Sequence, residues 1–274
     1  MISLDHAVPH LDDPKIGRRA SINPYLTCAY DVFWRLAWDV KPESWRSRAR
    51  LKHLKDSHRG EKAVIMCNGP SLNRVDFESL SGVYCFGLNK INLMFEKTAF
   101  RPSCIVAIDM LVIEQNAAFY NATEIPLFLP QDAVDFVKSG PDRIFVHLTG
   151  ARRRFSGDSS MSINGGHTVT NVALHLAFHL GFDSVAIVGC DHHYNAKGPP
   201  GKVFQTDPSD TDHFDPRYWS SVPMKYANLF EMEVSYQQAF NYYRAHGRKL
   251  VNATDGGKLE ILPRMALEEF LHGR

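Results

Sequence analysis

The residues of this chain whose types could do chemistry stand where short apolar runs end. Two are amides and two are carboxylates: Asn68, Asn89, Asp109 and Asp191. The carboxyl ends of parallel strands lie along one edge of an α/β sheet, so four such side chains would line one crevice. Amides suit a nucleotide, and two aspartates could hold Mg²⁺ against a diphosphate because hard cations prefer oxygen ligands. Each residue alone is explained as a turn former, but the four together favour a ligand site.

The turn after the first apolar run is the most informative of these ends. The run 63–67 stops at Asn68-Gly69-Pro70-Ser71, a composition that favours a tight turn over regular structure. Such a turn offers an amide, a hydroxyl and backbone N–H groups to a phosphate or a ribose, but an ordinary strand-to-helix turn has the same composition. The G-x-G-x-x-G and G-x-x-x-x-G-K-[ST] motifs are absent, which argues against dinucleotide dehydrogenases and P-loop kinases.

A glycine-rich segment precedes the clearest predicted helix, residues 168–180. Free N–H groups and the helix dipole favour an anion at such an N-terminus, although capping by Asn164 or Thr168 is the alternative interpretation. His175 and His179 lie one turn apart on this helix, and the missing H-E-x-x-H glutamate favours packing over metal binding. The predicted anion-binding residues are Gly165, Gly166, His167 and Thr168.

Histidines supply the candidate general base. His213 lies in a segment rich in Gly, Pro, Asp and Ser, about residues 195–223, and a long irregular segment after a strand is typical of an active-site lid. A histidine on such a loop can act as a base near neutral pH. His192 and His193 follow Asp191 directly, so the sequence leaves the choice of base open.

Alternating strands and helices must position these groups. Helical patterns over 168–180 and 226–246, with a short one over 263–272, accompany apolar runs bounded by turn residues. This order predicts a Rossmann-like, doubly wound, mostly parallel α/β sheet. We divide the chain into an N-terminal helical extension, 1–60, and a nucleotide-binding catalytic domain, 61–274, with the lid at about 195–223. The predicted strands are 63–67, 83–87, 104–108, 144–148, 185–188 and 249–251.

Composition excludes several classes of protein. The 31 basic and 30 acidic residues argue against a nucleic-acid binder, and no apolar stretch approaches the ~20 residues of a membrane span. The acidic N-terminus is not typical of a signal peptide, and five cysteines without a C-x-x-C pair fit a reducing cytoplasm.

One local charge run stands apart from this balance. Residues 41–62 carry eight basic side chains against three acidic ones, and Trp34, Trp38 and Trp45 lie close by. We expect for residues 34–62 either a solvated helix or peripheral contact with the inner face of an anionic membrane.

Several motifs, taken in their order along the chain, resemble a known group. They are Asn68-Gly-Pro-Ser-Leu72, Phe86-Gly-Leu-Asn89, Ile108-Asp109, the helix ending at Gly181-Phe182, Val188-Gly-Cys-Asp191, His213-Phe214, and Asn252-Ala-Thr254 with Gly256-Gly257. The order is similar to that of bacterial MptE-like proteins, often linked to surface-polysaccharide synthesis, and more distantly to the family 42 sialyltransferases. The resemblance covers about residues 55–272.

The sialyltransferase resemblance implies a CMP-sugar donor, transfer with inversion at the anomeric carbon, and no required cofactor. His213 is the nearest match to the lid histidine that deprotonates the acceptor hydroxyl, and Tyr194, or less closely Tyr218, matches a tyrosine that assists the departing phosphate. We group Asp191 with these two as catalytic. The resemblance places the nucleotide against Asn68, Gly69, Pro70, Ser71 and Asn89.

Three functions stay open on the sequence. The first is a glycosyltransferase of cell-surface glycan synthesis, whose partners are a nucleotide-sugar donor and a glycan acceptor. Asp109 stands where the sialyltransferases have asparagine, and a carboxylate would repel a donor phosphate unless it is protonated or bridged by a metal. The second function is therefore a diphosphotransferase that resembles 6-hydroxymethylpterin diphosphokinases, with ATP, and with Mg²⁺ on Asp109 and Asp191. The third is a non-catalytic nucleotide-sugar-binding protein. The resemblance also implies a homo-oligomer.

Overall fold

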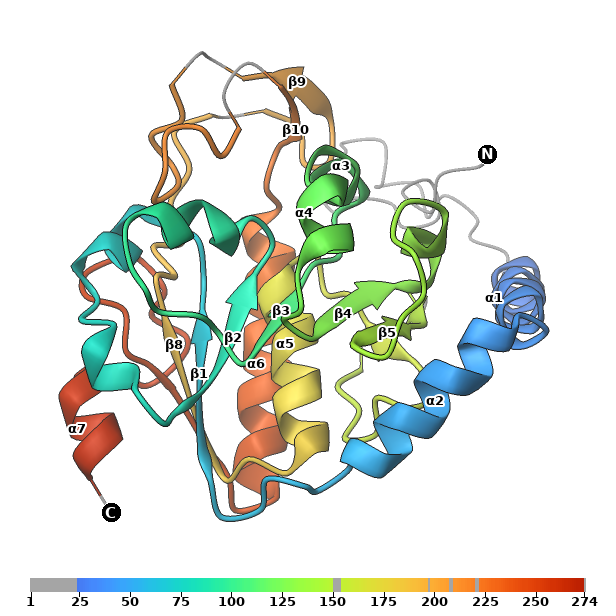
Figure 1. The fold of residues 1–274 in the computed structure, drawn as a ribbon, viewed down its shortest axis with the longest axis horizontal. Coiled ribbons are helices and arrows are strands. Elements are labelled where there is room, and N and C mark those ends of the chain that lie inside the picture. The colour runs from blue at the N-terminus through green and yellow to red at the C-terminus, as the bar shows by residue number, and fades with distance from the viewer. Residues whose placement is uncertain (1–23, 150–153, 197, 207–208, 220–221, 274) are drawn as a thin grey trace.

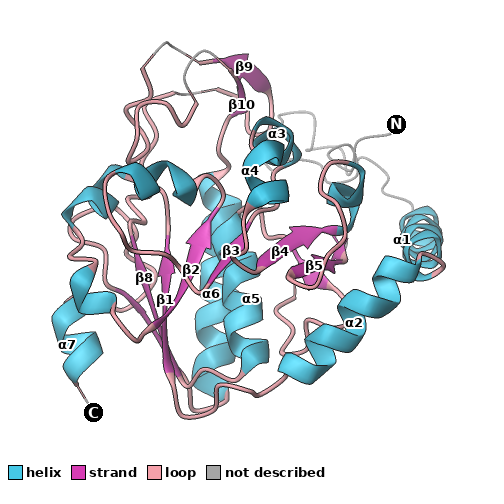
Figure 2. Cartoon of the chain, in the orientation of Figure 1, coloured by secondary structure: helices cyan, strands magenta, loops and turns pink. Residues whose placement is uncertain are grey.

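A seven-stranded sheet forms the centre of the protein, and all of its strands run parallel (Figures 1 and 2). The computed structural model describes residues 24–149, 154–196, 198–206, 209–219 and 222–273. The strand order is β11-β8-β1-β2-β3-β4-β5, which confirms the predicted doubly wound α/β fold. The strands are β1 (Lys62–Met66), β2 (Tyr84–Leu88), β3 (Cys104–Val106), β4 (Leu127–Pro130), β5 (Arg143–Val146), β8 (Ser184–Val188) and β11 (Lys249–Asn252).

Strand β1 lies where the strand order reverses. Its residue Val64 pairs with Cys85 of β2 on one side and with Ala186 of β8 on the other. Residues 63–66 are fully buried, because helices and turns cover both faces of the sheet, as parallel sheets require. In a doubly wound sheet the reversal leaves a crevice beyond the carboxyl ends of the two diverging strands, and here these strands are β1 and β8.

Two hydrophobic cores lie on opposite faces of the sheet. Alternate residues of β1 divide between them, with Ile65 in one core and Met66 in the other. The first core contains side chains of α2 (Pro42–Leu54), α5 (Val169–Leu180) and α6 (Leu229–Ala245). The second contains side chains of α1 (Pro24–Asp39), α3 (Met110–Gln115), α4 (Ala117–Ala122) and α7 (Leu267–His272).

Helix α2 belongs to the body of the protein because it covers the edge strand β5. The Ser47 hydroxyl accepts a hydrogen bond from the backbone N–H of Phe145 at 2.8 Å, which satisfies a donor that an open sheet edge would leave unpaired. Arg50 donates to the carbonyl oxygens of Gly140 and Arg143, and Leu51 is buried in the core. Of the predicted extension, residues 1–23 lie outside the described residues.

The helix prediction at residues 168–180 is confirmed in detail. Thr168 is the N-cap of α5, with its hydroxyl accepting the N–H of Thr170, and Gly181 ends the helix in the left-handed conformation at φ 102°. Strand β4 was not predicted, because Pro126 precedes and Pro130 ends an apolar run of only three residues, and proline is disfavoured inside strands.

The lid-like segment has some regular structure of its own. It contains an antiparallel hairpin of β9 (Val203–Gln205) and β10 (Pro223–Lys225), which Figure 1 shows beyond the carboxyl ends of β1 and β2. Residues 197, 207–208 and 220–221 of this segment lie outside the described residues. A second small sheet pairs β6 (Leu148–Thr149) with β7 (Ile163–Asn164), the strand that leads to α5.

Candidate nucleotide site

The turn after β1 is fastened to the end of β8. The Asp191 carboxylate accepts hydrogen bonds from the backbone N–H and the hydroxyl of Ser71, at 3.1 and 2.7 Å. The N–H of Gly69 donates to the carbonyl oxygen of Gly189 at 2.8 Å. A Cβ on Gly69 would overlap the Asp191 carboxylate, so only glycine fits between the two loops. Asp191 therefore shapes the predicted ligand turn, rather than standing free beside it.

Two buried amide oxygens at this edge have no hydrogen-bond partner among the described residues. They are Oδ1 of Asn68, at the end of β1, and Oδ1 of Asn89, at the end of β2. Asn89 is in the left-handed conformation at φ 47°, which asparagine tolerates better than most residues. Leaving a buried polar atom unpaired costs about 1–3 kcal/mol. A ligand with hydrogen-bond donors would remove this cost at both positions.

The lid packs directly against these two amides. The N–H of Phe214 donates to the backbone oxygen of Asn68 at 2.9 Å, and Asn73 donates to the carbonyl oxygen of Phe214 at 2.8 Å. Tyr218 is buried, and its phenol oxygen accepts a hydrogen bond from the Asn89 side-chain amide, whose Oδ1 remains without a partner among the described residues. The segment around residues 213–218 therefore bridges the ends of β1 and β2.

His213 forms a pair with a carboxylate within this bridge. Its Nδ1 lies 2.8 Å from Oδ2 of Asp210, and its ring stacks on Tyr218 with 4.2 Å between centroids. Burial acts to raise the pKa of Asp210, but the hydrogen bond and charge of His213, with nearby backbone N–H groups, hold it below its ordinary value. An ionised Asp210 fixes the Nδ1–H tautomer, which leaves Nε2 as the basic atom.

Tyr194 lies close to this pair. Its ring centroid is 6.4 Å from that of His213, in an edge-to-face arrangement. Burial, and then the neighbouring groups of Cys190, Cys67 and Asp212, raise the pKa of the Tyr194 phenol. The phenol therefore keeps its proton at neutral pH and can serve as a hydrogen-bond donor to an anion.

Lys90 places a positive charge beside Asp109. Its ammonium donates to Oε1 of Gln115 and to the carbonyl oxygen of Tyr218, both at 2.7 Å, and lies 4.8 Å from the ring centroid of Trp219. Burial lowers the pKa of Lys90 to about 8, against the opposing charges of Asp109 and Asp210. Asp109 itself caps α3 by accepting the N–H of Leu111 at 2.9 Å.

The glycine-rich turn before α5 lies at the same edge of the sheet. The Thr170 hydroxyl is 3.4 Å from the thiol of Cys67, the residue before Asn68. Gly166 adopts a left-handed φ of 59°, an added Cβ there would overlap Asn171 and Ser235, and its carbonyl oxygen accepts the Ser235 hydroxyl at 2.9 Å. The exposed His167 is also left-handed. Gly165, the fourth residue predicted to bind an anion, has open space around its Cα.

The two alternative histidines have other neighbours. Nε2 of His192 lies 3.0 Å from the carboxylate of Glu233 on α6, and the exposed His193 ring lies 3.2 Å from the Lys258 ammonium. His213 contacts the lid residues that bond the two amides, whereas His192 faces α6. The C-terminal turn closes this side, since the N–H of Lys258 donates to the carbonyl oxygen of Asp191 at 2.8 Å.

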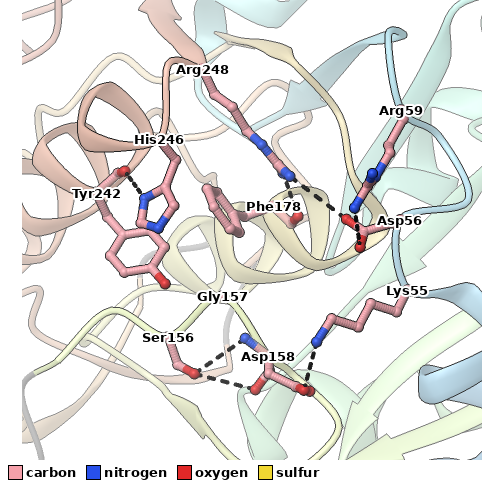
Figure 3. Close-up of a pocket in the computed structure, with 10 residues that line it drawn as sticks. All are labelled: Lys55, Asp56, Arg59, Ser156, Gly157, Asp158, Phe178, Tyr242, His246 and Arg248. Atoms are coloured by element: carbon pink, nitrogen blue, oxygen red, sulfur yellow. Dashed lines mark hydrogen bonds and ion pairs between the residues drawn. The ribbon is translucent and has the colours of Figure 1, made fainter.

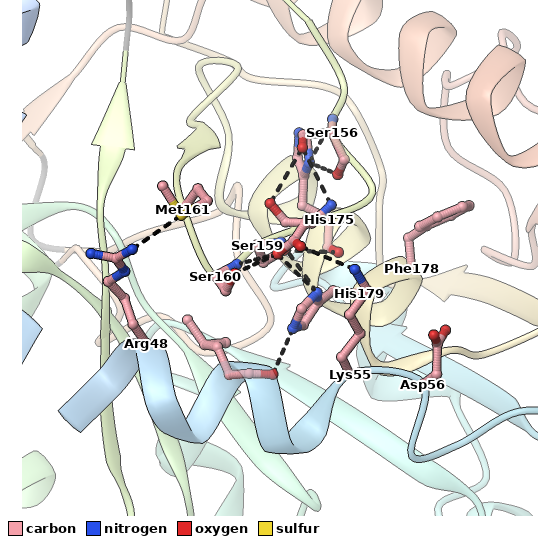
Figure 4. Close-up of polar contacts among 12 residues, drawn as sticks. Arg48, Lys55, Asp56, Ser156, Ser159, Ser160, Met161, His175, Phe178 and His179 are labelled. Carbon is pink, nitrogen blue, oxygen red and sulfur yellow. Dashed lines mark hydrogen bonds and ion pairs between the residues drawn. The ribbon is translucent and has the colours of Figure 1, made fainter. Parts of the chain in front are cut away.

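His175 and His179 pack inside the protein, as the sequence predicts (Figure 4). His175 stacks on Phe155 at 3.8 Å between centroids. His179 joins α5 to α2, because its Nδ1 lies 3.2 Å from the N–H of Ser159 and its Nε2 lies 2.8 Å from the carbonyl oxygen of Leu51. These contacts favour a structural role for both rings.

A solvent-open pocket lies at the opposite, amino-terminal edge of the sheet (Figure 3). Its charged groups are paired with one another: Arg59 and Arg248 with Asp56, and Lys55 with Asp158. The pocket is hollow, but its paired charges leave little for a ligand to satisfy. The candidate site is therefore at the carboxyl edge.

No group of three or more His, Cys, Asp or Glu side chains in the described part of the chain could hold a metal ion. Asp191 is occupied by Ser71, and Asp109 by the N–H of Leu111. The two carboxylates predicted as Mg²⁺ ligands thus each accept hydrogen bonds from the protein itself.

Sequence reasoning missed two residues of this site, Lys90 and Asp210. Both had a signal. Lys90 directly follows the strand-end amide Asn89, and Asp210 precedes His213 by three residues, a spacing that lets a carboxylate reach an imidazole within one turn.

Comparison with known proteins gives one family and one structure. The family model described as "6-hydroxymethylpterin diphosphokinase MptE-like" matches residues 43–197. The structure of the MAf glycosyltransferase from Magnetospirillum magneticum AMB-1 is similar at 16% sequence identity with a TM-score of 0.49, over 81% of this chain and 38% of that one. The chain thus spans well under half of that protein. No curated protein matches the chain.

Proposed function

The chain belongs to the MptE-like family, and from this premise we propose that it is a glycosyltransferase that uses a CMP-activated sugar in cell-surface glycan synthesis. The observation that carries the proposal is the Asp210–His213 pair, held by the lid against the strand ends of Asn68 and Asn89. A base oriented by a carboxylate, next to unsatisfied groups for a ligand, is what deprotonation of an acceptor hydroxyl requires.

The donor nucleotide lies, in this proposal, across the ends of β1 and β2. Oδ1 of Asn68 and of Asn89 accept N–H or O–H groups of the cytidine, and the Ser71 turn supplies the wall that Asp191 holds in place. Lys90 and the N-terminus of α5 face the donor's negative charge. The Lys90 ammonium offsets the charge of Asp109. In this proposal, it therefore reduces the repulsion between the Asp109 carboxylate and the donor phosphate.

The transfer step then follows from the positions of His213 and Tyr194. Nε2 of His213 takes the proton of the acceptor hydroxyl, and that oxygen attacks the anomeric carbon from the face opposite the phosphate. The bond between the anomeric carbon and the phosphate oxygen breaks, and its electron pair leaves with CMP. The Tyr194 phenol donates a hydrogen bond to the departing phosphate. Inversion at the anomeric carbon is the result.

A thermal-shift panel tests the nucleotide. CMP, CDP, UDP, GDP and ATP are each added with and without Mg²⁺, because a ligand that binds only the folded state raises its apparent stability. We expect stabilisation by CMP without metal, and hydrolysis or transfer with a CMP-sugar. Stabilisation by CMP with neither hydrolysis nor transfer for any CMP-sugar would identify a non-catalytic binding protein instead.

The runner-up is a diphosphotransferase acting on a pterin-like alcohol, and the name of the matching family favours it. It requires ATP binding that depends on Mg²⁺ and on Asp109. Asp109→Asn separates the two proposals: it abolishes metal-dependent ATP stabilisation in the diphosphotransferase and leaves CMP stabilisation in place in the glycosyltransferase.

A further inference from the structure

The outward face of α1 is apolar and largely exposed. Tyr25, Val32 and Leu36 are 83%, 58% and 58% exposed, and together with Ala29 and Val40 they recur at the spacing of one helical face. Phe33 widens this stripe, and Trp45 of α2 extends it at 70% exposure. Contiguous exposed apolar surface of this kind marks an interaction site. We call this surface the α1 face: Tyr25, Leu26, Ala29, Val32, Phe33, Leu36, Val40 and Trp45.

The opposite side of α1 anchors the helix to the body. Trp38 is buried in the second core, Arg35 donates to the carbonyl oxygen of Met161, and Asp39 pairs with Arg48 of α2 at 3.4 Å. Figure 1 shows α1 at the margin of the molecule, joined to the body where it meets α2. The apolar stripe is therefore held outward by the fold, rather than left over from a helix with no fixed orientation.

The fully exposed charges around the α1 face have one sign. Among the exposed residues that the structure describes between positions 25 and 53, the ionised side chains are Lys41, Arg46 and Lys52, and none is Asp or Glu. Of the acidic groups in this region, Glu43 is buried and pairs with Arg46 and Ser47, whereas Asp31 and Asp39 are half-buried and Asp39 pairs with Arg35 and Arg48. The surface thus combines apolar and aromatic side chains with positive charge.

We propose that the α1 face lies on an anionic lipid bilayer, with its apolar stripe in the boundary between headgroups and acyl chains. At about 1.5 Å per residue, the 16 residues of α1 make a helix that lies in the interface. Tyr25 and Trp45 are the aromatic types that favour this depth, and Lys41 and Arg46 meet the anionic headgroups. None of the helices in the described ranges is long and apolar enough to cross a membrane.

A second copy of the chain fits this surface less well. An isologous contact brings the same patch of both subunits together, so Lys41 and Arg46 would approach their own counterparts. The exposed residues of this region provide no carboxylate to pair with them. An anionic lipid surface supplies negative charge to every cation at once. The sequence predicted contact through residues 34–62, and the contact proposed here begins earlier, at Tyr25.

Vesicle flotation of the full chain tests the proposal. We expect binding to vesicles of equal parts phosphatidylcholine and phosphatidylglycerol, weak binding to phosphatidylcholine alone, and release by salt because charge contributes to the affinity. Phe33→Glu should weaken binding by at least ~10-fold. Phe230→Glu is the matched control, since Phe230 is an exposed phenylalanine of α6, at 53% against 62% for Phe33.

A second variant isolates the charge, and two results would overturn the proposal. Lys41→Glu with Arg46→Glu should weaken binding to the anionic vesicles by at least ~10-fold, with little change on phosphatidylcholine. Phe33, Lys41 and Arg46 are all exposed, so we expect these variants to keep the unfolding temperature of the parent, which confirms that they fold. Equal binding of the Phe33 and Phe230 variants contradicts the proposal. So does a chain that ignores vesicles but self-associates in sedimentation velocity until Phe33→Glu makes it monomeric.

Discussion

The two edges of the central sheet differ in how their polar groups are satisfied. At the amino edge, the pocket of Figure 3 is lined with charges that pair with each other, such as Asp56 with Arg59. At the carboxyl edge, Oδ1 of Asn68 and of Asn89 are buried without a partner among the described residues. A hollow alone therefore does not identify a site. Two unsatisfied buried oxygens at neighbouring strand ends are the stronger indication, because a ligand with hydrogen-bond donors would recover the cost of both.

The largest expected effect comes from removing an imidazole at the carboxyl edge, with removal of an imidazole at the amino edge as the comparison. His213→Ala should lower transfer by about 10²–10⁴-fold, the range typical of a general base, while CMP still binds. His246→Ala removes an exposed ring that stacks on Tyr242 at the amino edge, and should leave turnover unchanged. The measurement is initial rate with a CMP-sugar beside a thermal shift with CMP. Unchanged turnover in His213→Ala would remove the base from the mechanism.

Adding a methyl group to one glycine at each edge tests how tightly the two edges are packed. Gly69→Ala pushes a Cβ into the Asp191 carboxylate and to 2.7 Å from the Gly189 carbonyl oxygen, so we expect a loss of about 3 kcal/mol in the free energy of unfolding and loss of nucleotide binding. Gly140→Ala, at the amino edge, meets only Arg143 Cγ at 3.6 Å and should change stability by less than ~0.5 kcal/mol. Denaturant unfolding measures both, and equal values would mean that the β1 turn relaxes around the new methyl group.

Removing one polar group from each edge should have opposite consequences. Asn68→Ala should weaken CMP binding by about 10-fold while leaving the free energy of unfolding within ~0.5 kcal/mol of the parent, because its Oδ1 has no partner to lose. Asp56→Asn should leave CMP affinity unchanged and lower stability by up to ~1 kcal/mol, since it breaks the pairs with Arg59 and Arg248. Calorimetric titration and denaturant unfolding together decide, and a destabilised Asn68→Ala would count against an unpaired oxygen.

The smallest effect concerns pH. Burial lowers the pKa of Lys90 to about 8, and a bound phosphate favours the protonated form, so CMP affinity should be greatest below pH 8. Above it, affinity should fall by up to about 10-fold per pH unit as the free protein loses this proton. Lys90→Met should bind CMP more weakly below pH 8 and show no such decline, whereas Lys55→Met at the amino edge should retain the full profile. A parent affinity that is flat from pH 7 to 9.5 would exclude Lys90 from the nucleotide site.

The sequence predicted the carboxyl edge better than it predicted how that edge is built. Asn68 and Asn89 could be found because strand ends of a parallel sheet share one edge, a property of the fold itself. Asp191 could not be separated from them by the same rule: only the structure reveals that it is bonded to Ser71. Lys90 and Asp210 were missed because their place depends on how the lid folds back onto β2, and no periodic pattern encodes a loop.

The fold was predictable to the same degree and for the same reason. Strands buried on both faces, such as β1 and β8, give continuous apolar runs that the sequence displays. Strand β4 was not predicted because Pro126 and Pro130 are more typical of a loop. Its place is fixed by pairing with β3 and β5 rather than by local preference. The packing of α2 on β5 likewise depends on contacts such as Ser47 with Phe145, 98 residues apart.

The bond between Ser71 and Asp191 spans 120 residues of sequence, and this separation bears on the order in which the protein folds. Strand β1 can pair with β2 early, but its other neighbour, β8, leaves the ribosome only after most of the chain has been made. Contacts of such long range form slowly, since the entropy of closing the loop must be overcome first. A nascent chain that ends before Asp191 therefore has the complete β1 turn in its sequence and nothing to hold it in shape, so nucleotide binding should arise late in synthesis.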